Sequence, residues 1–371
     1  MDRFKVIPFP LDFKVRIFNI TNPDEIYAGG VPAVTEIDNN GPIMSIRVGD
    51  FLFDGISICK NPGLIGGIAC TQIRNIGADV KNLVEMEDGS LVFTIDLYEV
   101  FRGINDVSKL GLINYFNGSK YIDNWVKQID ANGESVPGIC NMINGSDSAI
   151  YPPFIDRDKP IFAINLDICR SVQLKYQYDT EYDGIPVARF TLNEWFLDNH
   201  EGCFCLNVTG GITQENGCLL KGAMELYSCA LIVLSYPHFL YADHTYINGV
   251  IGMTPVVDEH RIYADLDPYT GTVIRGSKRA QFNIFMRPVT NIAMTQNLRT
   301  TLTPILWIDE GMSLPDDLSD MIKTRLLGSL NLVDIFIPIF ISLSVIIAVF
   351  GIVNNRDTYI LVLFVVTSYL L

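Results

Sequence analysis

Apolar and polar residues alternate with a period of two along much of this chain. The clearest stretches are residues 13–18, FKVRIF, and 172–178, VQLKYQY, and such alternation is typical of strands that bury one face. Further strands are predicted at residues 91–95, 187–192, 281–286 and 303–308. Turn signals separate the strands, namely Asp88-Gly89, Asn117-Gly118, Asp183-Gly184 and Thr270-Gly271. The pattern predicts an α+β, β-rich fold with a large barrel or sandwich.

Helical patterns are concentrated near the end of the chain. Residues 315–330 begin with a proline and two aspartates, which favour a helix start, and their apolar residues fall on one face. Residues 332–353, LVDIFIPIFISLSVIIAVFGIV, are almost uncharged and would cover about 33 Å as a helix, which matches one bilayer core. A buried core helix rarely contains so long an uncharged run. We therefore expect a transmembrane helix at 332–353.

The predicted span divides the chain into three parts. Residues 1–331 show no repeat or linker-like composition shift, so we expect one ectodomain. The tail 354–371 carries a second apolar run that would reach only about 21 Å as a helix, too short to cross a bilayer comfortably. Hydrophobic residues make up 49% of the chain, and the mean hydropathy is +0.25, which fits a span, a buried apolar cavity or both. The net charge of −15 argues against binding to nucleic acid.

Cysteine usage indicates an oxidising compartment. The chain has eight cysteines, and most of them fall within residues 140–229. Such clustering is typical of disulfide-bonded proteins, and spacing alone leaves fifteen ways to pair six cysteines. A zinc site built from the Cys203-x-Cys205 pair with His200 or His238 is the alternative. A structural zinc site normally shows repeated pairs at short spacing, so disulfides are favoured.

Four glycosylation sequons support the same compartment. Asn19, Asn117, Asn144 and Asn207 each stand two residues before a serine or threonine. A single sequon is a weak signal, because the triplet also occurs in cytosolic chains. Four sequons, clustered cysteines and a membrane anchor are independent observations, and together they predict a glycosylated secretory-pathway ectodomain.

Motifs for catalysis are scarce in this sequence. It contains no Gly-x-Ser-x-Gly nucleophile elbow, no His-Glu-x-x-His zinc motif and no dinucleotide fingerprint. Ser235, His238 and Asp243 lie close together, but the members of a catalytic triad usually come from different loops. We expect no enzyme activity, no cofactor and no metal. The aromatic residues, 11% of the chain, are expected mainly in the core, with a lipid-sized apolar tunnel as the sharper interpretation.

Several long stretches resemble the class B scavenger receptor family, which includes fatty-acid translocase. These stretches are PLDFKVRIFNITNPDE, CNMINGSDSAIYPPF, DICRSVQLKYQYDTEYDGIPVARF, YPHFLYAD, DEHRIYADLDPYTGTVIRGSKRAQFNIFMRP and TTLTPILWIDEG. Within that family, DFLFDGISICKNPG, VEMEDGS and VFRGINDVSKLG are most similar to the branch of insect sensory neuron membrane proteins. The resemblance is specific because the stretches are long and occur in the same order.

The resemblance implies a large antiparallel β-barrel-like ectodomain with an apolar tunnel, an apical helical bundle and two membrane helices. It also implies the disulfides Cys140–Cys203, Cys169–Cys229 and Cys205–Cys218. Cys59 and Cys70 have no counterpart in the family pattern, and a local bridge between them is a hypothesis. Residues 1–14 lack the family's N-terminal span, and the chain passes over the segment that holds the apical bundle. We expect a shortened form, and no ligand-binding residue can be assigned.

The resemblance favours one function over two alternatives. The leading hypothesis is a membrane receptor or transfer protein that takes apolar ligands, such as fatty-acid-derived pheromones or other lipids. It would deliver them to the membrane or to an odorant receptor complex. We expect it in the plasma membrane of sensory neuron dendrites or support cells, with an extracellular ectodomain. The alternatives are a general scavenger or adhesion receptor for lipids and lipoproteins, and a non-functional truncated isoform.

Overall fold

The computed structural model describes residues 11–38, 57–58, 83–85, 91–93, 98–122, 124–165, 168–200, 202–226, 229–290 and 292–354. Contacts between Cα atoms divide the chain into two units. The first comprises Met1–Tyr182 with Pro186–Leu314, and the second comprises Asp183–Ile185 with Pro315–Leu371. The predicted Cys59–Cys70 bridge and the tail beyond Asn354 lie outside the described residues.

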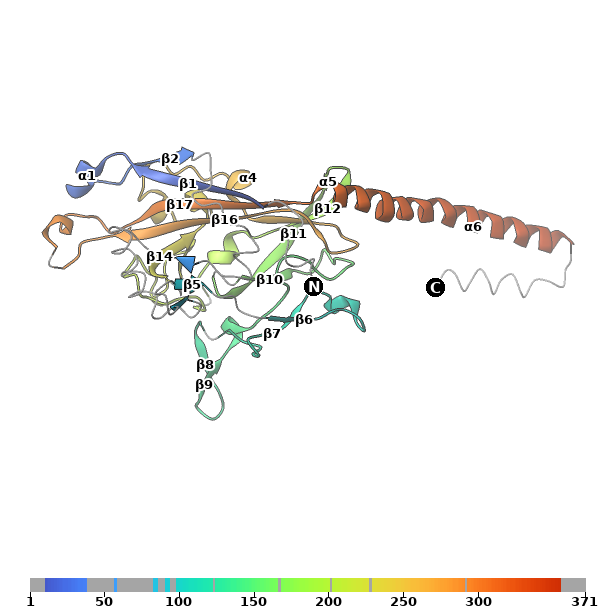
Figure 1. Cartoon of the computed structure of the whole chain (residues 1–371), viewed down its shortest axis with the longest axis horizontal. Helices are drawn as coiled ribbons and strands as arrows, with labels where there is room; N and C mark the ends of the chain where they lie inside the picture. The colour runs from blue at the N-terminus through green and yellow to red at the C-terminus, as the bar shows by residue number, and fades with distance from the viewer. Residues whose placement is uncertain are drawn as a thin grey trace. The chain divides into compact units, whose positions relative to one another are not determined.

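The first unit is built mainly of strands (Figure 1). Its strands are β1 Leu11–Ile20, β2 Val34–Asp38, β3 Ser57–Ile58, β4 Leu83–Glu85, β5 Leu91–Phe93, β6 Tyr98–Val100, β7 Ile113–Phe116, β8 Lys127–Ile129, β9 Ser135–Pro137, β10 Ile161–Asn165, β11 Arg170–Tyr182, β12 Ile185–Thr191, β13 Ala223–Leu226, β14 Cys229–Ser235, β15 Tyr263–Leu266, β16 Val273–Met286 and β17 Thr301–Ser313. Its short α-helices are α1 Pro23–Tyr27, α3 His244–Ile247 and α4 Val257–His260. Short 3₁₀ turns occur at Val107–Lys109, Ile139–Asn141, Glu194–Leu197, Pro237–Phe239 and Ala293–Thr295.

A ten-stranded antiparallel sheet organises this unit. Its main order is β10-β11-β12-β15-β16-β17-β1-β2, and β14 pairs with both β13 and β16. Figure 1 shows β16 and β17 running side by side, as their long register requires. The strand order does not return to its first strand, so the described strands form an open sheet. The predicted antiparallel, β-rich character is confirmed, but these strands do not close into a barrel. Alternation identifies a strand with one buried face, but closure depends on tilt and register, which no single strand encodes.

Five predicted strands are confirmed. The ranges 13–18, 172–178, 281–286 and 303–308 lie within β1, β11, β16 and β17, and 187–192 overlaps β12 in all but its last residue. Two predicted turns also join neighbouring strands. Asp183-Gly184 connects β11 to β12, and Thr270-Gly271 connects β15 to β16. Gly184 and Gly271 both have φ near +75°, a conformation that glycine adopts without steric cost.

The two faces of the sheet differ in polarity because strand residues alternate between them. One face carries Ala188, Phe190, Leu266 and Val273, which belong to the largest apolar cluster of the unit. The other face carries charged and polar residues whose Cα atoms are register partners, including Arg189 with Asp265, Asp265 with Arg275, and Arg279 with Asp309. A second apolar cluster, which includes Phe18, Phe239, Tyr246 and Trp307, also packs in this unit.

The second unit contains the predicted helical segments. Residues 315–330 form α5 (Asp316–Met321), a π-helical turn (Ile322–Leu327) and the start of α6 (Gly328–Asn354). Lys323 Nζ lies 2.6 Å from Asp183 Oδ2, which ties the helix to the β11–β12 turn inside this unit. The helical run Asp316–Phe350 is long and apolar enough to cross a membrane, and its most apolar window is not buried by the protein. The predicted span therefore lies in α6.

Candidate functional site

Two disulfides connect the cysteine-rich part of the chain. Cys140 pairs with Cys203 and Cys205 pairs with Cys218, as the family resemblance implied. Both sulfurs of the Cys203-x-Cys205 motif are therefore bonded and cannot serve as zinc ligands. The main-chain oxygen of Cys169 accepts a hydrogen bond of 2.6 Å from Trp125 Nε1. The predicted Cys169–Cys229 disulfide stays a prediction, because the side chain of Cys229 is not among the described groups.

A buried carboxylate holds the loop that the Cys205–Cys218 disulfide closes. Glu225 on β13 is 3% exposed and accepts hydrogen bonds from the main-chain nitrogens of Leu206, Val208 and Thr209. Thr209 Oγ1 also donates to Glu225 Oε1 at 2.6 Å. A buried carboxylate is costly unless it is hydrogen-bonded, and here four donors surround it. Sequence reasoning missed Glu225, because its role depends on the distant loop that folds over it.

The four sequons differ in accessibility. Asn19 and Asn117 are exposed, and so are the hydroxyl residues Thr21 and Ser119 of the same triplets. Asn207 is exposed, but its partner Thr209 is 4% exposed and bonded to Glu225. In the Asn144 triplet the asparagine is half-buried and Ser146 is fully buried. The folded chain therefore presents the Asn19 and Asn117 triplets most openly.

Ser235, His238 and Asp243 have separate partners and do not form a triad. Ser235 Oγ donates to the oxygen of Tyr236 and accepts from Asn283 Nδ2. His238 Nε2 lies 3.0 Å from Glu36 Oε2. Asp243 caps α3 by accepting from the nitrogen of Thr245. The close spacing of these three residues in the sequence therefore reflects a structural turn.

A histidine-lined pocket of about 320 Å³ opens beside β1 and β2. Its walls come from Arg16, Glu36, His238, Thr254, Glu259 and His260. The two imidazole rings stack at 4.5 Å, and each Nδ1 accepts a main-chain N–H, from Thr254 for His238 and from Val256 for His260. In the neutral form of each ring, an Nδ1 atom that accepts such a bond leaves the ring hydrogen on Nε2.

His260 is held in its neutral form. Burial lowers its pKa from 6.5 to about 4, and the positive charges of Arg279 and Arg16 act in the same direction. The rings of Trp307 and His260 pack edge to face, with 5.7 Å between their centroids. Sequence reasoning considered His238 only as a zinc or triad candidate and did not find His260. His260 precedes β15 and His238 precedes α3, and no local pattern in the sequence indicates that the two rings stack.

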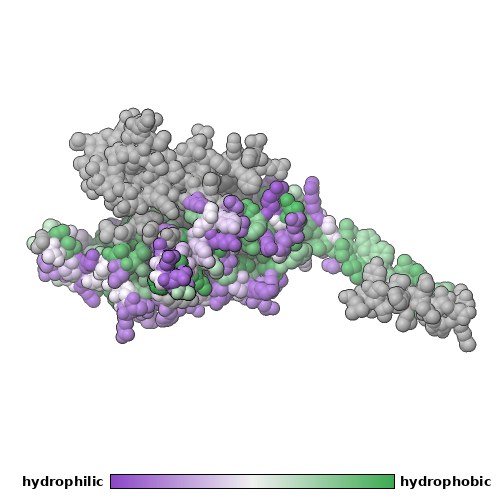
Figure 2. Space-filling view, turned by 90° about the horizontal axis from the view of Figure 1, so that it is seen from below, coloured by the Kyte–Doolittle hydropathy of each residue, from purple (hydrophilic) through white to green (hydrophobic). Residues whose placement is uncertain are grey.

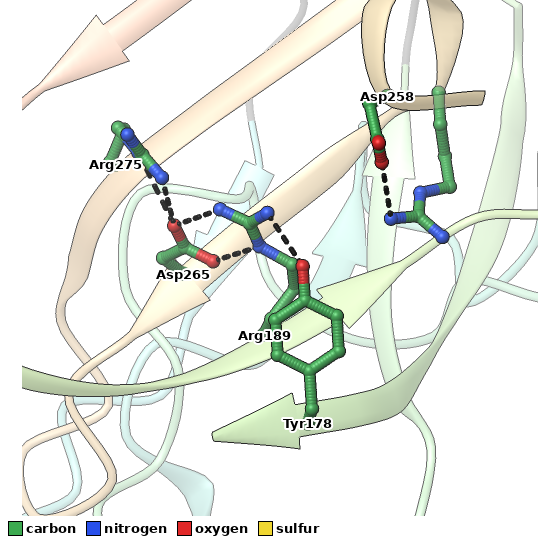
Figure 3. A network of polar contacts seen from close by, with 6 residues as sticks. Tyr178, Arg189, Asp258, Asp265 and Arg275 are labelled. Carbon is green, nitrogen blue, oxygen red and sulfur yellow. Dashed lines mark hydrogen bonds and ion pairs between the residues drawn. The ribbon is translucent and has the colours of Figure 1, made fainter. Parts of the chain in front are cut away.

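A second polar cluster lies on β11, β12, β15 and β16 (Figure 3). Asp265 is fully buried and accepts from Arg189 Nε and Nη2 at 2.6 and 2.7 Å, and from Arg275 Nε and Nη2 at 3.3 and 3.1 Å. Tyr178 Oη accepts from Arg189 Nη1 at 3.0 Å. Hydrogen bonding to Asp265 raises the pKa of Arg189 well above its usual value. The sequence does hint at this cluster, because the charged Arg189 stands between the apolar residues Ala188 and Phe190. It does not predict that β12 pairs with β15, the strand that carries Asp265.

The third candidate feature is the apolar helix of the second unit. Figure 2 shows hydrophobic surface along the described part of α6. Its large side chains, among them Phe336, Phe340 and Phe350, are about half exposed or more. Exposed apolar side chains over such a length are unfavourable in water and favourable in a bilayer. This exposure fits a helix that is covered by lipid.

Together these features define a membrane-anchored protein with a disulfide-bonded, antiparallel β-rich domain. The profile of the CD36 family matches residues 33–354, and the chain belongs to that family. It is 35% identical to "Sensory neuron membrane protein 2" of Drosophila melanogaster over 315 residues, which cover 80% of this chain and 56% of that protein. The chain thus spans little more than half the length of this relative.

Two further relatives show the range of the family. "Sensory neuron membrane protein 1" of Pediculus humanus subsp. corporis is 33% identical over 90% of this chain and 64% of its own length. "Lysosome membrane protein 2" of Rattus norvegicus is 24% identical over 87% of this chain and 79% of its own length. These comparisons bear out the resemblance on which the sequence analysis relied, including the similarity to the insect sensory neuron branch.

Proposed function

We propose that this protein is a membrane receptor that binds apolar ligands and passes them to the membrane. The observation that carries the proposal is its membership of the CD36 family, with sensory neuron membrane proteins among its relatives. The ligands would be fatty-acid-derived pheromones or other lipids. The recipient would be the lipid bilayer or an odorant receptor complex in chemosensory neurons, with the β-rich domain outside the cell.

The physical basis of the proposal is partition into an apolar tunnel in the β-rich domain. Each buried CH₂ group contributes about 0.8 kcal/mol, so a long-chain ligand strongly prefers such a tunnel to water. The largest apolar cluster contains Phe190, Phe196, Tyr151 and Trp125, which supply large apolar faces. An antiparallel sheet with one apolar face is a suitable wall for such a tunnel.

A displacement assay tests the proposal directly. The full chain is purified in detergent micelles and loaded with a fluorescent fatty ester, and unlabelled esters of increasing chain length compete for it. Binding should be saturable, and each added CH₂ should lower the inhibitory concentration about fourfold, the factor that corresponds to 0.8 kcal/mol. Empty micelles are the control for partition into detergent. Displacement that does not saturate, or that matches empty micelles, would contradict the proposal for this chain.

Location supplies a second test. A tag placed before Leu11 should be labelled on intact sensory cells without permeabilisation if the β-rich domain is extracellular. Expression confined to chemosensory tissue supports the pheromone proposal. Expression in gut or blood cells instead would favour a general scavenger or adhesion receptor. A chain that never leaves the endoplasmic reticulum, with glycans fully sensitive to endoglycosidase H, would indicate a non-functional truncated form.

A further inference from the structure

Arg189 and Arg275 share a single buried carboxylate. Both guanidinium groups donate two hydrogen bonds to Asp265, which is fully buried (Figure 3). One carboxylate neutralises one guanidinium, so this trio keeps one uncompensated positive charge. The surplus stands out in a chain whose net charge is −15. An anion that binds here would be attracted by a charge that these three described residues leave unmatched among themselves.

Arg275 is the accessible member of the pair. Its side chain is 33% exposed, whereas that of Arg189 is 15% exposed. Its Nε and Nη2 atoms face Asp265, and among the residues that the structure describes no acceptor is bonded to Nη1. The rings of Tyr182 and Tyr263 lie 4.6 and 5.5 Å from its guanidinium carbon. Both rings lie within cation–π distance of the guanidinium group.

The position of Arg275 along the sheet suggests the source of the anion. Arg275 is the register partner of Ser313, the last residue of β17. The chain leaves the sheet at this point and enters α5 at Asp316, the first residue of the helical run that is long enough to span a membrane. Only Leu314 and Pro315 therefore separate this end of β17 from the helical run along the chain.

We propose that Arg275, flanked by Tyr182 and Tyr263 and positioned by Asp265, binds the phosphate group of an anionic lipid or free phosphate. The planar guanidinium fork matches two oxygens of a phosphate group, and a charge-assisted pair of this kind is strong. Arg189 is a positioning residue. Its bonds to Asp265 and Tyr178 fix the carboxylate that in turn orients Arg275. This proposal does not rest on the proposed apolar tunnel.

The test uses the full chain in detergent micelles and calorimetric titration with three probes. These are short-chain phosphatidylglycerol, short-chain phosphatidylcholine with the same tails, and inorganic phosphate. Arg275→Gln removes the proposed ligand-binding charge. Arg157→Gln is the matched control, because Arg157 is 40% exposed, pairs with its own carboxylate Asp179 and lies near a tyrosine ring, so that pair has no surplus charge. Both variants change the net charge equally.

We expect saturable binding of phosphatidylglycerol that is weakened about tenfold or more by Arg275→Gln and changed less than about twofold by Arg157→Gln. Arg275→Lys keeps the charge without the fork, should give an intermediate affinity, and serves if the glutamine variant does not fold. Inorganic phosphate that binds as tightly as phosphatidylglycerol would identify free phosphate as the ligand. The proposal is overturned if neither anion binds saturably, if both glutamine variants behave alike, or if phosphatidylcholine binds equally well and is equally sensitive to Arg275→Gln.

Discussion

His260 should make the folded protein sensitive to acid. Its pKa is about 4 in the folded chain and 6.5 in the unfolded chain, so folding favours the neutral ring. The resulting stabilisation is complete above pH 6.5 and is lost as the pH falls from 6.5 to about 4. A difference of about 2.5 pKa units corresponds to at most about 3 kcal/mol of unfolding free energy. Protonation of Nδ1 would also place an N–H against the donor N–H of Val256.

The assay is chemical denaturation of the full chain in detergent, followed by tryptophan fluorescence at several pH values between about 7 and 4. His260→Gln removes the titrating group while its amide oxygen can still accept from Val256. The unfolding free energy of the variant should therefore decrease less steeply as the pH falls. The difference in slope from the wild type should correspond to the uptake of close to one proton on unfolding. His244→Gln, at an exposed histidine, is the matched control and should keep the wild-type slope. Equal slopes for wild type and His260→Gln would refute the assignment of acid sensitivity to His260.

Three further predictions follow from the candidate sites. Asn19→Gln and Asn117→Gln should each remove one glycan by mass spectrometry, whereas Asn144→Gln should leave the glycan number unchanged, because Ser146 is buried; a glycan at Asn144 would contradict this. Replacing both Cys140 and Cys203 by serine should lower the unfolding free energy by about 4 kcal/mol, and the same change at Cys205 and Cys218 should lower it by about 3 kcal/mol. The first loss is larger because its disulfide joins residues 63 positions apart and the second joins residues 13 positions apart. Denaturation curves of the two variants check this order. Glu225→Gln should cost about 1–3 kcal/mol and expose the loop at Leu206 to limited proteolysis, and an unchanged cleavage rate would exclude this role.

The sequence predicted the strands and the membrane helix because both depend on local patterns. Apolar and polar residues alternate from Val172 to Tyr178, as expected for a strand with one buried face, and these residues lie in β11. The run that contains Phe336 and Phe340 is apolar on all sides, which identifies a lipid-covered helix without any knowledge of the sheet. The disulfides Cys140–Cys203 and Cys205–Cys218 were obtained from family resemblance, because spacing permits many pairings.

The polar clusters could not be predicted, because they depend on register between distant segments. Glu36 and His238 are separated by 202 positions, and Arg189 and Asp265 by 76. Each residue alone looks like an ordinary polar residue on a strand or turn. The contact exists only once the strand order is known, and that order places β12 beside β15 and β1 between β17 and β2. For the same reason, the sequence could not predict that the described strands form an open sheet and not a barrel.

The charged residues Arg189, Asp265 and Arg275 form a row across β12, β15 and β16, and this row helps to specify the register of these strands. Arg189 follows Ala188 and precedes Phe190, and both of these apolar residues are fully buried in the main cluster. A slip of β12 by one residue would turn Arg189 toward the apolar cluster and Phe190 toward the polar face. Asp265 would then be buried without its closest partner, and an unpaired buried carboxylate is strongly destabilising. The row Arg189, Asp265 and Arg275 thus penalises the wrong pairings of β12, β15 and β16, and it leaves Arg275 with an open edge at the end of the sheet.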